Sequence, residues 1–489
     1  EGKFVKCLNT LTHRGPDGYG VRSLPGVTFG HRRLSILDIS ERGSQPMSYQ
    51  NERYWVTFNG EIYNFIEIRK ELIALGYSFV SDSDTEVILA SFVEWKEKCL
   101  DKFNGMWAFA IFDKEDNSVF LSRDRFGVKP LYYATQENLR EGGVFVFASE
   151  MKAITPFLKT ITPNNKLFKD LDRIFYYEST EECLIKEIKR FPAGHYAWIK
   201  NGEMQLRRFW NTLDYIVPNN ESYINHVKKF KELFIDACSL RMRSDVTMGT
   251  ALSGGLDSSA IFSTVAYLEN KNETERAGKD WQHAFCASFP NSPVDEKKYA
   301  QKVTDHLGVN LDIVIIDPTK DISKLYEYLY LFEDIYLTSP IPFVNLYGEM
   351  RKQNVKVTLD GHGADEFFGG YHFDFLHILY SNFYNPKALL AVFFAYFNSQ
   401  SENVDFRKQS KIIFIVKMIA KNFIKNIILV KNQSRESRHP TWKKLDYFTQ
   451  KLFISSHETV LPTLLRNYDR YSMINGVEIR MPFMDYRLV

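Results

Sequence analysis

Apolar and polar positions follow two different patterns in the two halves of the chain. In the first part, to about residue 200, short apolar runs are separated by turn residues. The runs 107–113 and 118–123 flank the polar stretch 114–117, a pattern typical of a β-hairpin. Hairpin-linked strands imply antiparallel sheets, which must bury their apolar faces under helices or each other. The other predicted elements here are strands at 54–58 and 144–148 and helices at 64–75 and 84–98.

The pattern changes near residue 219, after a break rich in Pro and Asn. From there, short apolar runs alternate with stretches of helical period. Alternating strands and helices predict a parallel sheet with right-handed crossovers. Ligands of such sheets bind beyond the carboxyl ends of the strands, where the glycine-rich loops 253–258 and 361–370 are expected. The predicted strands are 246–252, 283–289, 311–317 and 355–360, and the predicted helices are 259–269, 297–308, 320–331 and 342–353.

Composition narrows the classes of function. Among 489 residues, 62 Lys and Arg nearly balance 60 Asp and Glu, and the net charge of +2 gives no case for nucleic acid as a partner. No apolar run reaches the roughly 18 residues that span a bilayer. The five cysteines are odd in number and form no CxxC pair, which favours reduced thiols and a cytoplasmic location. They are Cys7, Cys99, Cys183, Cys238 and Cys286.

Residues 253–259, SGGLDSS, have the chemistry of a phosphate-binding loop. They join a predicted strand to a predicted helix, whose N-terminus carries a partial positive charge. Gly254 and Gly255 let the backbone turn tightly and expose its N–H groups. The loop lacks the Lys of GxxxxGK[ST]. The carboxylate of Asp257 beside a phosphate makes sense only with a divalent cation between them.

Two loops resemble those of asparagine synthetases. SGGLDSS resembles the loop of ATP pyrophosphatases, which cleave ATP between the α- and β-phosphates, and residues 360–371, DGHGADEFFGGY, resemble the asparagine synthetase loop SGEGSDExFGGY. The resemblance implies that Asp257 and Asp365 hold Mg²⁺ on the pyrophosphate of ATP. It implies ATP contacts at Leu252, Ser253, Gly254, Gly255, Asp257, Ser258, Ala287, Asp360 and Gly361.

Five phrases in the first 150 residues resemble class II glutamine amidotransferases, in that family's order. They are 13–18 (HRGPDG), 31–38 (HRRLSILD), 58–64 (FNGEIYN), 83–86 (SDTE) and 123–132 (RDRFGVKPLY). The resemblance implies that the Asn59 side chain and the Gly60 backbone N–H form an oxyanion hole. It also implies that Arg33 pairs with the α-carboxylate of glutamine, and that Asp84 and the region of Glu61 hold its α-ammonium.

The nucleophile of this family is a Cys at the mature N-terminus, whose free α-amine serves as its base. No such Cys is present, and Cys7 repeats at helical spacing with Phe4 and Leu11, which predicts a buried helix face. The resemblance therefore implies a short opening segment before Glu1. Near the other end, 469–473 (DRYSM) and 476–485 (GVEIRMPFMD) match family phrases that continue to a Lys, which is expected beyond Val489.

The resemblance implies an α/β fold with two domains. Residues 1–205 are expected to form an antiparallel αββα sandwich of the N-terminal-nucleophile type, the glutaminase domain. Residues 220–489 are expected to form a doubly wound parallel-sheet ATP-pyrophosphatase domain, the synthetase domain. Within it, residues 395–438 do not fit the family pattern and are interpreted as an insertion.

The implied reaction uses two sites. Glutamine is hydrolysed in the first domain, and ammonia crosses inside the protein to the second. There ATP activates the side chain of aspartate as an acyl-adenylate with release of pyrophosphate, and ammonia displaces AMP. We therefore expect a carbon–nitrogen ligase of asparagine biosynthesis, with ATP and Mg²⁺ as cofactors and glutamine and aspartate as substrates. The sequence leaves open whether the protein forms a homodimer.

His362 stands where the family loop has a Glu linked to forming the aspartyl-adenylate. A histidine can be neutral or charged near pH 7, so it cannot simply replace a fixed carboxylate. Two interpretations stay open: His362 packs against or caps the loop, or it marks a different acceptor carboxylate, such as a uronic acid of a surface polysaccharide. A third hypothesis, prompted by the absent N-terminal Cys, is a catalytically silent family member.

The insertion at 395–438 also has two interpretations. Lys417, Lys421 and Lys425 fall at i, i+4 spacing and share one helix face, opposite a strongly apolar face. One interpretation is a surface helix buried on the synthetase core. The other is a basic amphipathic helix that contacts a membrane surface through residues 411–431.

Overall fold

The chain forms two compact units in the computed structural model. Unit 1 contains Glu1–Asn211, Asn220–His362 and Pro462–Val489, and unit 2 contains Thr212–Asn219 and Gly363–Leu461. The residues that the structure describes are 2–140, 145–169, 177–217, 221–271, 274–278, 280–317, 319, 322–334, 339–371, 374–382, 385–399 and 434–489.

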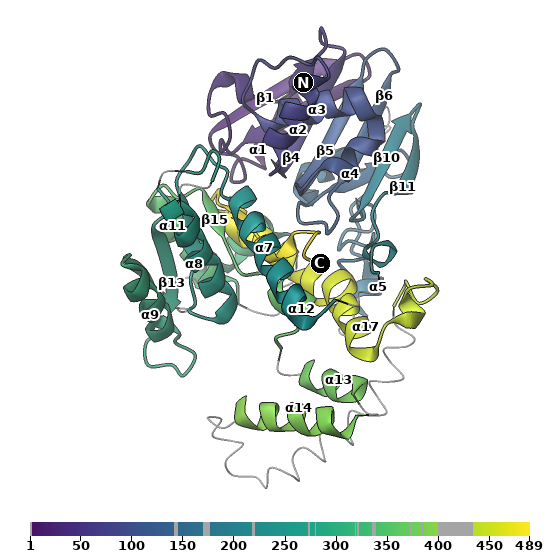
Figure 1. Cartoon of the computed structure of the whole chain (residues 1–489). Coiled ribbons are helices and arrows are strands. Elements are labelled where there is room, and N and C mark those ends of the chain that lie inside the picture. The colour runs from purple at the N-terminus through teal and green to yellow at the C-terminus, as the bar shows by residue number, and fades with distance from the viewer. Residues whose placement is uncertain are drawn as a thin grey trace. The chain divides into compact units, whose positions relative to one another are not determined.

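The first half of unit 1 is built on a six-stranded antiparallel sheet (Figure 1). The hairpin predicted at 107–113 and 118–123 is β5–β6, and the helices predicted at 64–75 and 84–98 are α2 (Phe65–Ala74) and α3 (Asp84–Trp95). In sheet order the strands are β11 (Glu203–Arg208), β10 (His195–Lys200), β6 (Ser118–Arg123), β5 (Gly105–Asp113), β4 (Tyr54–Ile62) and β3 (Met47–Tyr49).

Two smaller antiparallel sheets pack against this sheet through an apolar core. Phe29 and Tyr133 of the smaller sheets meet Trp55, Phe112 and Leu121 of the large one in a single buried cluster. This sheet-on-sheet arrangement confirms the antiparallel sheets expected of the N-terminal half. The smaller sheets contain β1 (Gly18–Leu24) with β2 (Val27–Arg33), and β8 (Phe145–Ala148), β7 (Tyr132–Thr135) and β9 (Lys189–Arg190); the accompanying helices are α1 (Gly2–Asn9), α4 (Cys99–Lys102) and α5 (Asn165–Phe168).

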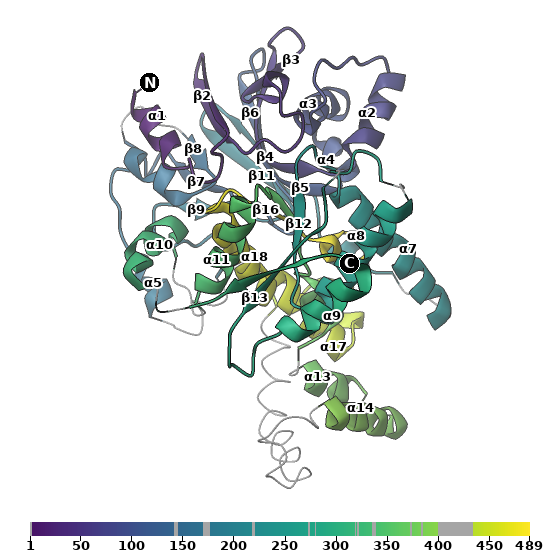
Figure 2. The same cartoon turned by 90° about the vertical axis from the view of Figure 1, so that its left-hand side faces the viewer.

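The second half of unit 1 is a five-stranded parallel sheet, as predicted. Its last strand, β16 (Glu478–Arg480), comes from the end of the chain and pairs with β15. Figure 2 labels β16, which lies in the yellow part of the chain. In sheet order the others are β14 (Leu311–Ile315), β13 (His283–Ser288), β12 (Met248–Ala251) and β15 (Val357–Leu359). The helices are α7 (Tyr223–Arg241), α8 (Leu256–Lys271), α9 (Lys297–Leu307), α10 (Leu325–Phe332), α11 (Ile341–Lys352) and most of α18 (Val460–Met473).

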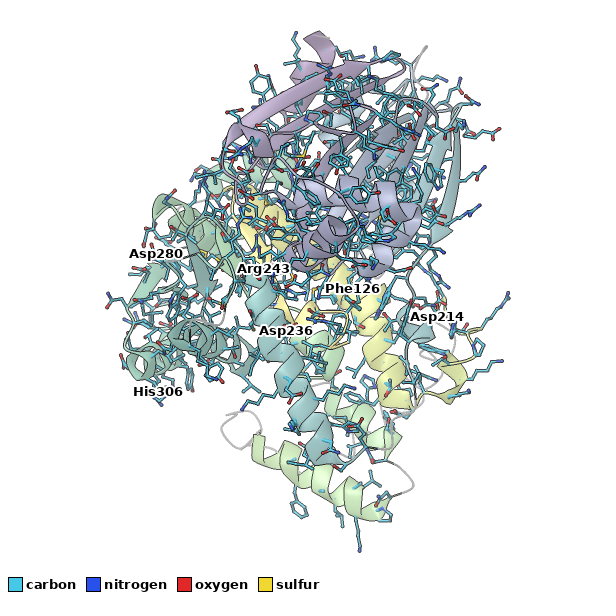
Figure 3. All side chains as sticks on the ribbon, turned by 45° about the horizontal axis from the view of Figure 1, so that its top comes forward. Phe126, Asp214, Asp236, Arg243, Asp280 and His306 are labelled. Atoms are coloured by element: carbon cyan, nitrogen blue, oxygen red, sulfur yellow. The ribbon has the colours of Figure 1, made fainter. Side chains whose placement is uncertain are left out.

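Ion pairs, some of them buried, join the two halves of unit 1. Arg14 of the HRGPDG phrase makes two hydrogen bonds to Asp469 on α18, at 2.8 and 2.9 Å, and one to Glu150 at 3.0 Å. Arg243, which follows α7 and is labelled in Figure 3, pairs with Glu67 of α2 at 2.6 Å. Segments that are far apart in the sequence therefore form ion pairs in the fold.

Unit 2 is helical in its described residues. Its small core gathers Leu213, Trp442, Phe453 and Ile454. Its helices are α12 (Ala364–Phe368), α13 (Asp374–Ser381), α14 (Pro386–Ser399), α17 (Tyr447–Phe453) and a π-helical turn at Ile454–Glu458.

Most of the predicted insertion cannot be compared with the structure. Residues 400–433, including the lysines at 417, 421 and 425, lie outside the described residues. In the part of the chain that is described, no helix combines the length and apolar character needed to cross a membrane.

Candidate active sites

One cavity of about 890 Å³ in unit 1 is lined by all five residues predicted to contact glutamine. They reach it from three places: the last residue of strand β2, the carboxyl end of strand β4, and the first residue of helix α3. The five are Arg33, Asn59, Gly60, Glu61 and Asp84.

Strand β4 turns its last residues into the cavity at a position that only glycine tolerates. Gly60 has φ +150°, and a Cβ there would lie 2.0 Å from the carbonyl oxygen of Met106 on β5. Asn59, the residue before it, donates from Nδ2 to the Ser149 hydroxyl at 3.4 Å. The backbone N–H and the carboxamide predicted to form an oxyanion hole are thus adjacent on one rigid strand.

Helix α3 places Asp84 at the same cavity. Its N-terminus is capped by the Ser83 hydroxyl, which accepts from the Thr85 backbone N–H at 3.1 Å. The Asp84 carboxylate accepts from the Ile62 backbone N–H at 2.9 Å, and burial raises its pKa to about 6. It therefore stays ionised at neutral pH.

Buried charges surround Glu61. Burial raises the pKa of Glu61 well above its ordinary range, and Arg480, 3.1 Å away, opposes that rise. Glu478 pairs with Arg480 at 3.1 Å and with Lys129 at 2.9 Å. Counting Asp84, three carboxyl groups face two cations here, and burial raises the pKa of two of them, so a bound cationic group would stabilise their ionised forms.

Arg33 occupies another wall of the cavity. Its guanidinium donates to the Ser40 carbonyl at 2.8 Å and also contacts the Asp38 carbonyl. The hydrogen-bond acceptors of Arg33 are therefore backbone carbonyls and not carboxylates. Its guanidinium keeps a positive charge that suits an anionic ligand group.

His31, the first residue of the HRRLSILD segment, had no predicted role but also lines this cavity. Its Nε2 lies 3.0 Å from the Phe58 carbonyl, and burial lowers its pKa to about 4, so the ring is neutral near pH 7. The neighbouring Cys7 is buried on α1, and burial raises the pKa of its thiol, which keeps it protonated. This matches the prediction that Cys7 belongs to a packed helix face.

The phosphate loop follows β12 as the sequence predicts, but helix α8 begins at Leu256 and not at 259. Asp257 and Ser258 therefore belong to its first turn, near the positive end of the helix dipole. Just before the helix, the Ser253 hydroxyl accepts from the Gly255 backbone N–H at 3.1 Å, which fixes the loop that leads into it.

Gly254 is the tightest point of this loop. Its φ is +81°, and a Cβ there would lie 2.3 Å from the backbone nitrogen of Ala300 and from the carbonyl carbon of Tyr299. The loop thus packs directly on the backbone of α9, and Gly254 is required for both conformation and space.

The predicted nucleotide contacts gather at the carboxyl ends of three neighbouring strands. Leu252 follows β12, Ala287 lies at the end of β13, and Asp360 follows β15. A Cβ on Gly361 would lie 3.0 Å from Cβ of Asp257, so the two glycine-rich loops approach closely. This edge of the sheet is where ligands of such folds bind.

The side chain of Asp360 is already engaged by the protein. It accepts from the Thr358 hydroxyl at 2.6 Å and from the Tyr347 hydroxyl at 2.8 Å. His362 lies next to it, with Nε2 3.6 Å from the carboxylate, and its ring stacks on Tyr468 with a centroid distance of 3.6 Å. The imidazole is therefore held in a defined position beside the loop.

Asp365 belongs to unit 2, in the first turn of α12. Burial raises the pKa of its carboxyl, a penalty that a bound cation would relieve. A Cβ on Gly370 would lie 1.7 Å from Asp365 Oδ1, so that glycine leaves room for the carboxylate. A carboxylate such as that of Asp365 suits Mg²⁺, which takes one or two carboxylates together with phosphate oxygens. No cage of three or more such side chains occurs among the described residues.

Two family profiles cover nearly the whole chain. One described as a glutamine amidotransferase domain matches residues 1–210, and one described as asparagine synthase matches residues 229–489. The chain belongs to the glutamine-hydrolysing asparagine synthetase family. It is accordingly a glutamine-hydrolysing ligase, and its family is ATP-dependent.

Individual relatives agree with this assignment. Asparagine synthetase [glutamine-hydrolyzing] 1 of Bacillus subtilis is 31% identical across 99% of this chain and 76% of its own length. Asparagine synthetase B of Escherichia coli is 31% identical across 76% of this chain and 61% of its own length. A solved glutamine phosphoribosylpyrophosphate amidotransferase from B. subtilis shares 15% identity over 73% of this chain and 71% of that chain, with a TM-score of 0.31.

The five phrases and two loops contained the predicted site residues, but three charged residues around Glu61 had no predicted role. Lys129, Glu478 and Arg480 stand in the quoted phrases, yet their pairing around Glu61 depends on strands that meet only in the folded chain. Nothing in the local sequence pattern singled them out, because Lys129 lies in a loop and Glu478 and Arg480 lie on the three-residue strand β16, which was not predicted.

Proposed function

We propose that this chain forms asparagine from aspartate, using ATP and the ammonia released from glutamine. The observation that supports this best is the cavity at Asn59, Gly60 and Asp84, which gathers every predicted glutamine contact. A phosphate loop at the end of a parallel sheet lies in the same unit. Residues 1–205 are proposed as the glutaminase domain and 220–489 as the synthetase domain.

In the glutaminase half, each group has a separate task. Arg33 would bind the α-carboxylate, while Glu61 and Asp84 would bind the α-ammonium, a cation that would stabilise their ionised forms. The carboxamide would then lie against Asn59 and the Gly60 backbone N–H. These donors would stabilise the oxygen as its carbon becomes tetrahedral.

In the synthetase half, the backbone of Ser253, Gly254 and Gly255 and the N-terminus of α8 would hold the phosphates of ATP. Asp257 and Asp365 are the proposed ligands of Mg²⁺, which would neutralise the pyrophosphate as it leaves. The aspartate carboxylate would attack the α-phosphorus to give a β-aspartyl-adenylate and pyrophosphate. Ammonia would then displace AMP and give asparagine.

His362 supports a second candidate acceptor. Its ring is held by Tyr468 beside the buried Asp360, where an imidazole offers no permanent negative charge. A different carboxylate, such as a uronic acid, is therefore the alternative to aspartate.

Pyrophosphate release decides between the two acceptors. The protein is incubated with ATP, Mg²⁺ and an ammonium salt, and either aspartate or glucuronate is added. We expect release that depends on aspartate and asparagine as the product. Release with glucuronate alone would support the second candidate, and release with neither would reject both.

Glutamine binding should weaken below about pH 6. The pKa of Asp84, raised by burial to about 6, means that its carboxylate is ionised above that pH and protonated below it. Only the ionised form can pair with an α-ammonium, so the Kd should rise as pH falls, by up to about tenfold per pH unit. Titration calorimetry between pH 8 and pH 5 measures this.

Two controls accompany that titration. Glutaramate, which is glutamine without its α-amine, should bind with little dependence on pH. Asp82→Asn alters a carboxylate whose side chain is 72% exposed and should leave the glutamine curve unchanged. A glutamine Kd that stays constant to pH 5 would remove Asp84 from the site.

A further inference from the structure

Arg480 is a fully buried cation whose guanidinium is hydrogen-bonded through Nε and Nη1 and lies beside a carboxylate through Nη2. Its Nη1 donates to the carbonyls of Arg241 at 3.0 Å and Arg243 at 2.6 Å. Its Nε donates to Glu478 at 3.1 Å, and its Nη2 lies 3.1 Å from Glu61 Oε1. The guanidinium is therefore fixed in place by protein groups, and Glu61 is its remaining contact.

The position of Arg480 in the fold makes this contact unusual. It lies on β16 of the parallel sheet, where its carbonyl accepts from the Asp360 backbone N–H at 3.0 Å. Its side chain reaches Glu61 at the end of β4, a strand of the antiparallel sheet. Glu478, two residues away on the same strand face, lines the cavity itself.

We propose that Arg480 is a positioning residue for glutamine: it holds the Glu61 carboxylate toward the α-ammonium, so that the synthetase sheet completes the glutaminase site. The proposal rests on the proposed function of the cavity. A purely structural ion pair would affect binding of the whole ligand. The proposed role affects only the contact with the α-ammonium.

The energetics favour this role. A buried carboxylate without a cation tends to bind a proton, and burial already raises the pKa of Glu61. Arg480 opposes that tendency, while Lys129 shares the charge of Glu478 so that Arg480 is not neutralised by Glu478 alone. Removing Arg480 would raise the cost of ionising Glu61 further and would free its carboxylate to turn away, so an α-ammonium would lose a positioned partner.

The test compares two ligands that differ only at the α-amine. Calorimetry on this 489-residue chain gives the Kd of glutamine and of glutaramate. Arg480→Met should weaken glutamine binding about 10- to 100-fold, the range of a lost charged hydrogen bond, and change glutaramate binding less than about twofold. Arg480→Lys keeps a cation but cannot bridge Glu61 and Glu478 in the same way, so its loss should be smaller and still selective for glutamine.

The matched control is Arg241→Met. Arg241 is also buried in unit 1 and pairs with Asp485 at 3.0 Å, and its side chain makes no ion pair with Glu61. It should leave the ratio of the two Kd values unchanged even if the melting temperature falls.

Each outcome has a distinct meaning. If the Arg480 variants lose both ligands equally, or lose neither, the positioning role is wrong. If Arg480→Met does not fold, Arg480→Lys decides by the same ratio. If the unaltered chain does not bind glutamine, the proposed function of the cavity fails, which is separate from any result on Arg480.

Discussion

Gly254→Ala is expected to lower the rate of ATP-dependent pyrophosphate release by at least about 100-fold, the size of effect that a displacement of about 1 Å in a reacting group can cause. The added Cβ would lie 2.3 Å from the backbone of α9, at Ala300 and at Tyr299. Neither backbone atom can move alone, so the loop itself must shift. The residue would also have to keep φ +81°, which costs a non-glycine residue about 1–2 kcal/mol.

A matched glycine separates the two contributions. Gly308 has φ +69° at the end of α9, but a Cβ there meets nothing within 4 Å. Gly308→Ala should therefore cost stability without slowing pyrophosphate release. In Gly254→Ala, the Kd of glutamine should remain unchanged because the cavity does not include the loop. A rate within a few-fold of the unaltered protein would show that the loop does not hold ATP.

Arg14→Met is expected to lower the free energy of unfolding of unit 1 by about 3–5 kcal/mol, as when one partner of a buried ion pair is removed. Asp469 would keep its charge, with a side chain only 8% exposed and two hydrogen bonds lost. Glu150 would be affected less because Arg470 and Lys152 remain beside it. Urea unfolding followed by tryptophan fluorescence measures the change.

Lys70→Met provides the exposed counterpart. Lys70 pairs with Glu275 at 3.3 Å, with side chains 65% and 53% exposed, and so also links the two halves of unit 1. Exposed pairs contribute less than about 1 kcal/mol, so its unfolding midpoint should barely move. Equal effects of the two substitutions would show that the Arg14 cluster is not a buried charge network.

Local patterns in the sequence predicted most elements that surround the sites. The hairpin β5–β6 and helices α2 and α3 follow from hydrophobic period and turn residues, which act over a few residues. The predicted start of α8 was three residues too late, because Gly-Gly and Ser-Ser around Leu256 carry no helical period and the turn there is set by the loop conformation. Strand β16, only three residues long, has no period of its own to detect.

The sequence by itself determined the chemical parts of this protein. The phrases around Asn59 and the SGGLDSS loop contain the donors, glycines and carboxylates that the two sites need. Only the tertiary structure decided which charges meet. Arg480 faces Glu61, and Arg14 faces Asp469, across more than 400 residues of chain. Such pairs carry no local signal, because their energy depends on burial and distance, and both exist only after distant strands and helices have packed together.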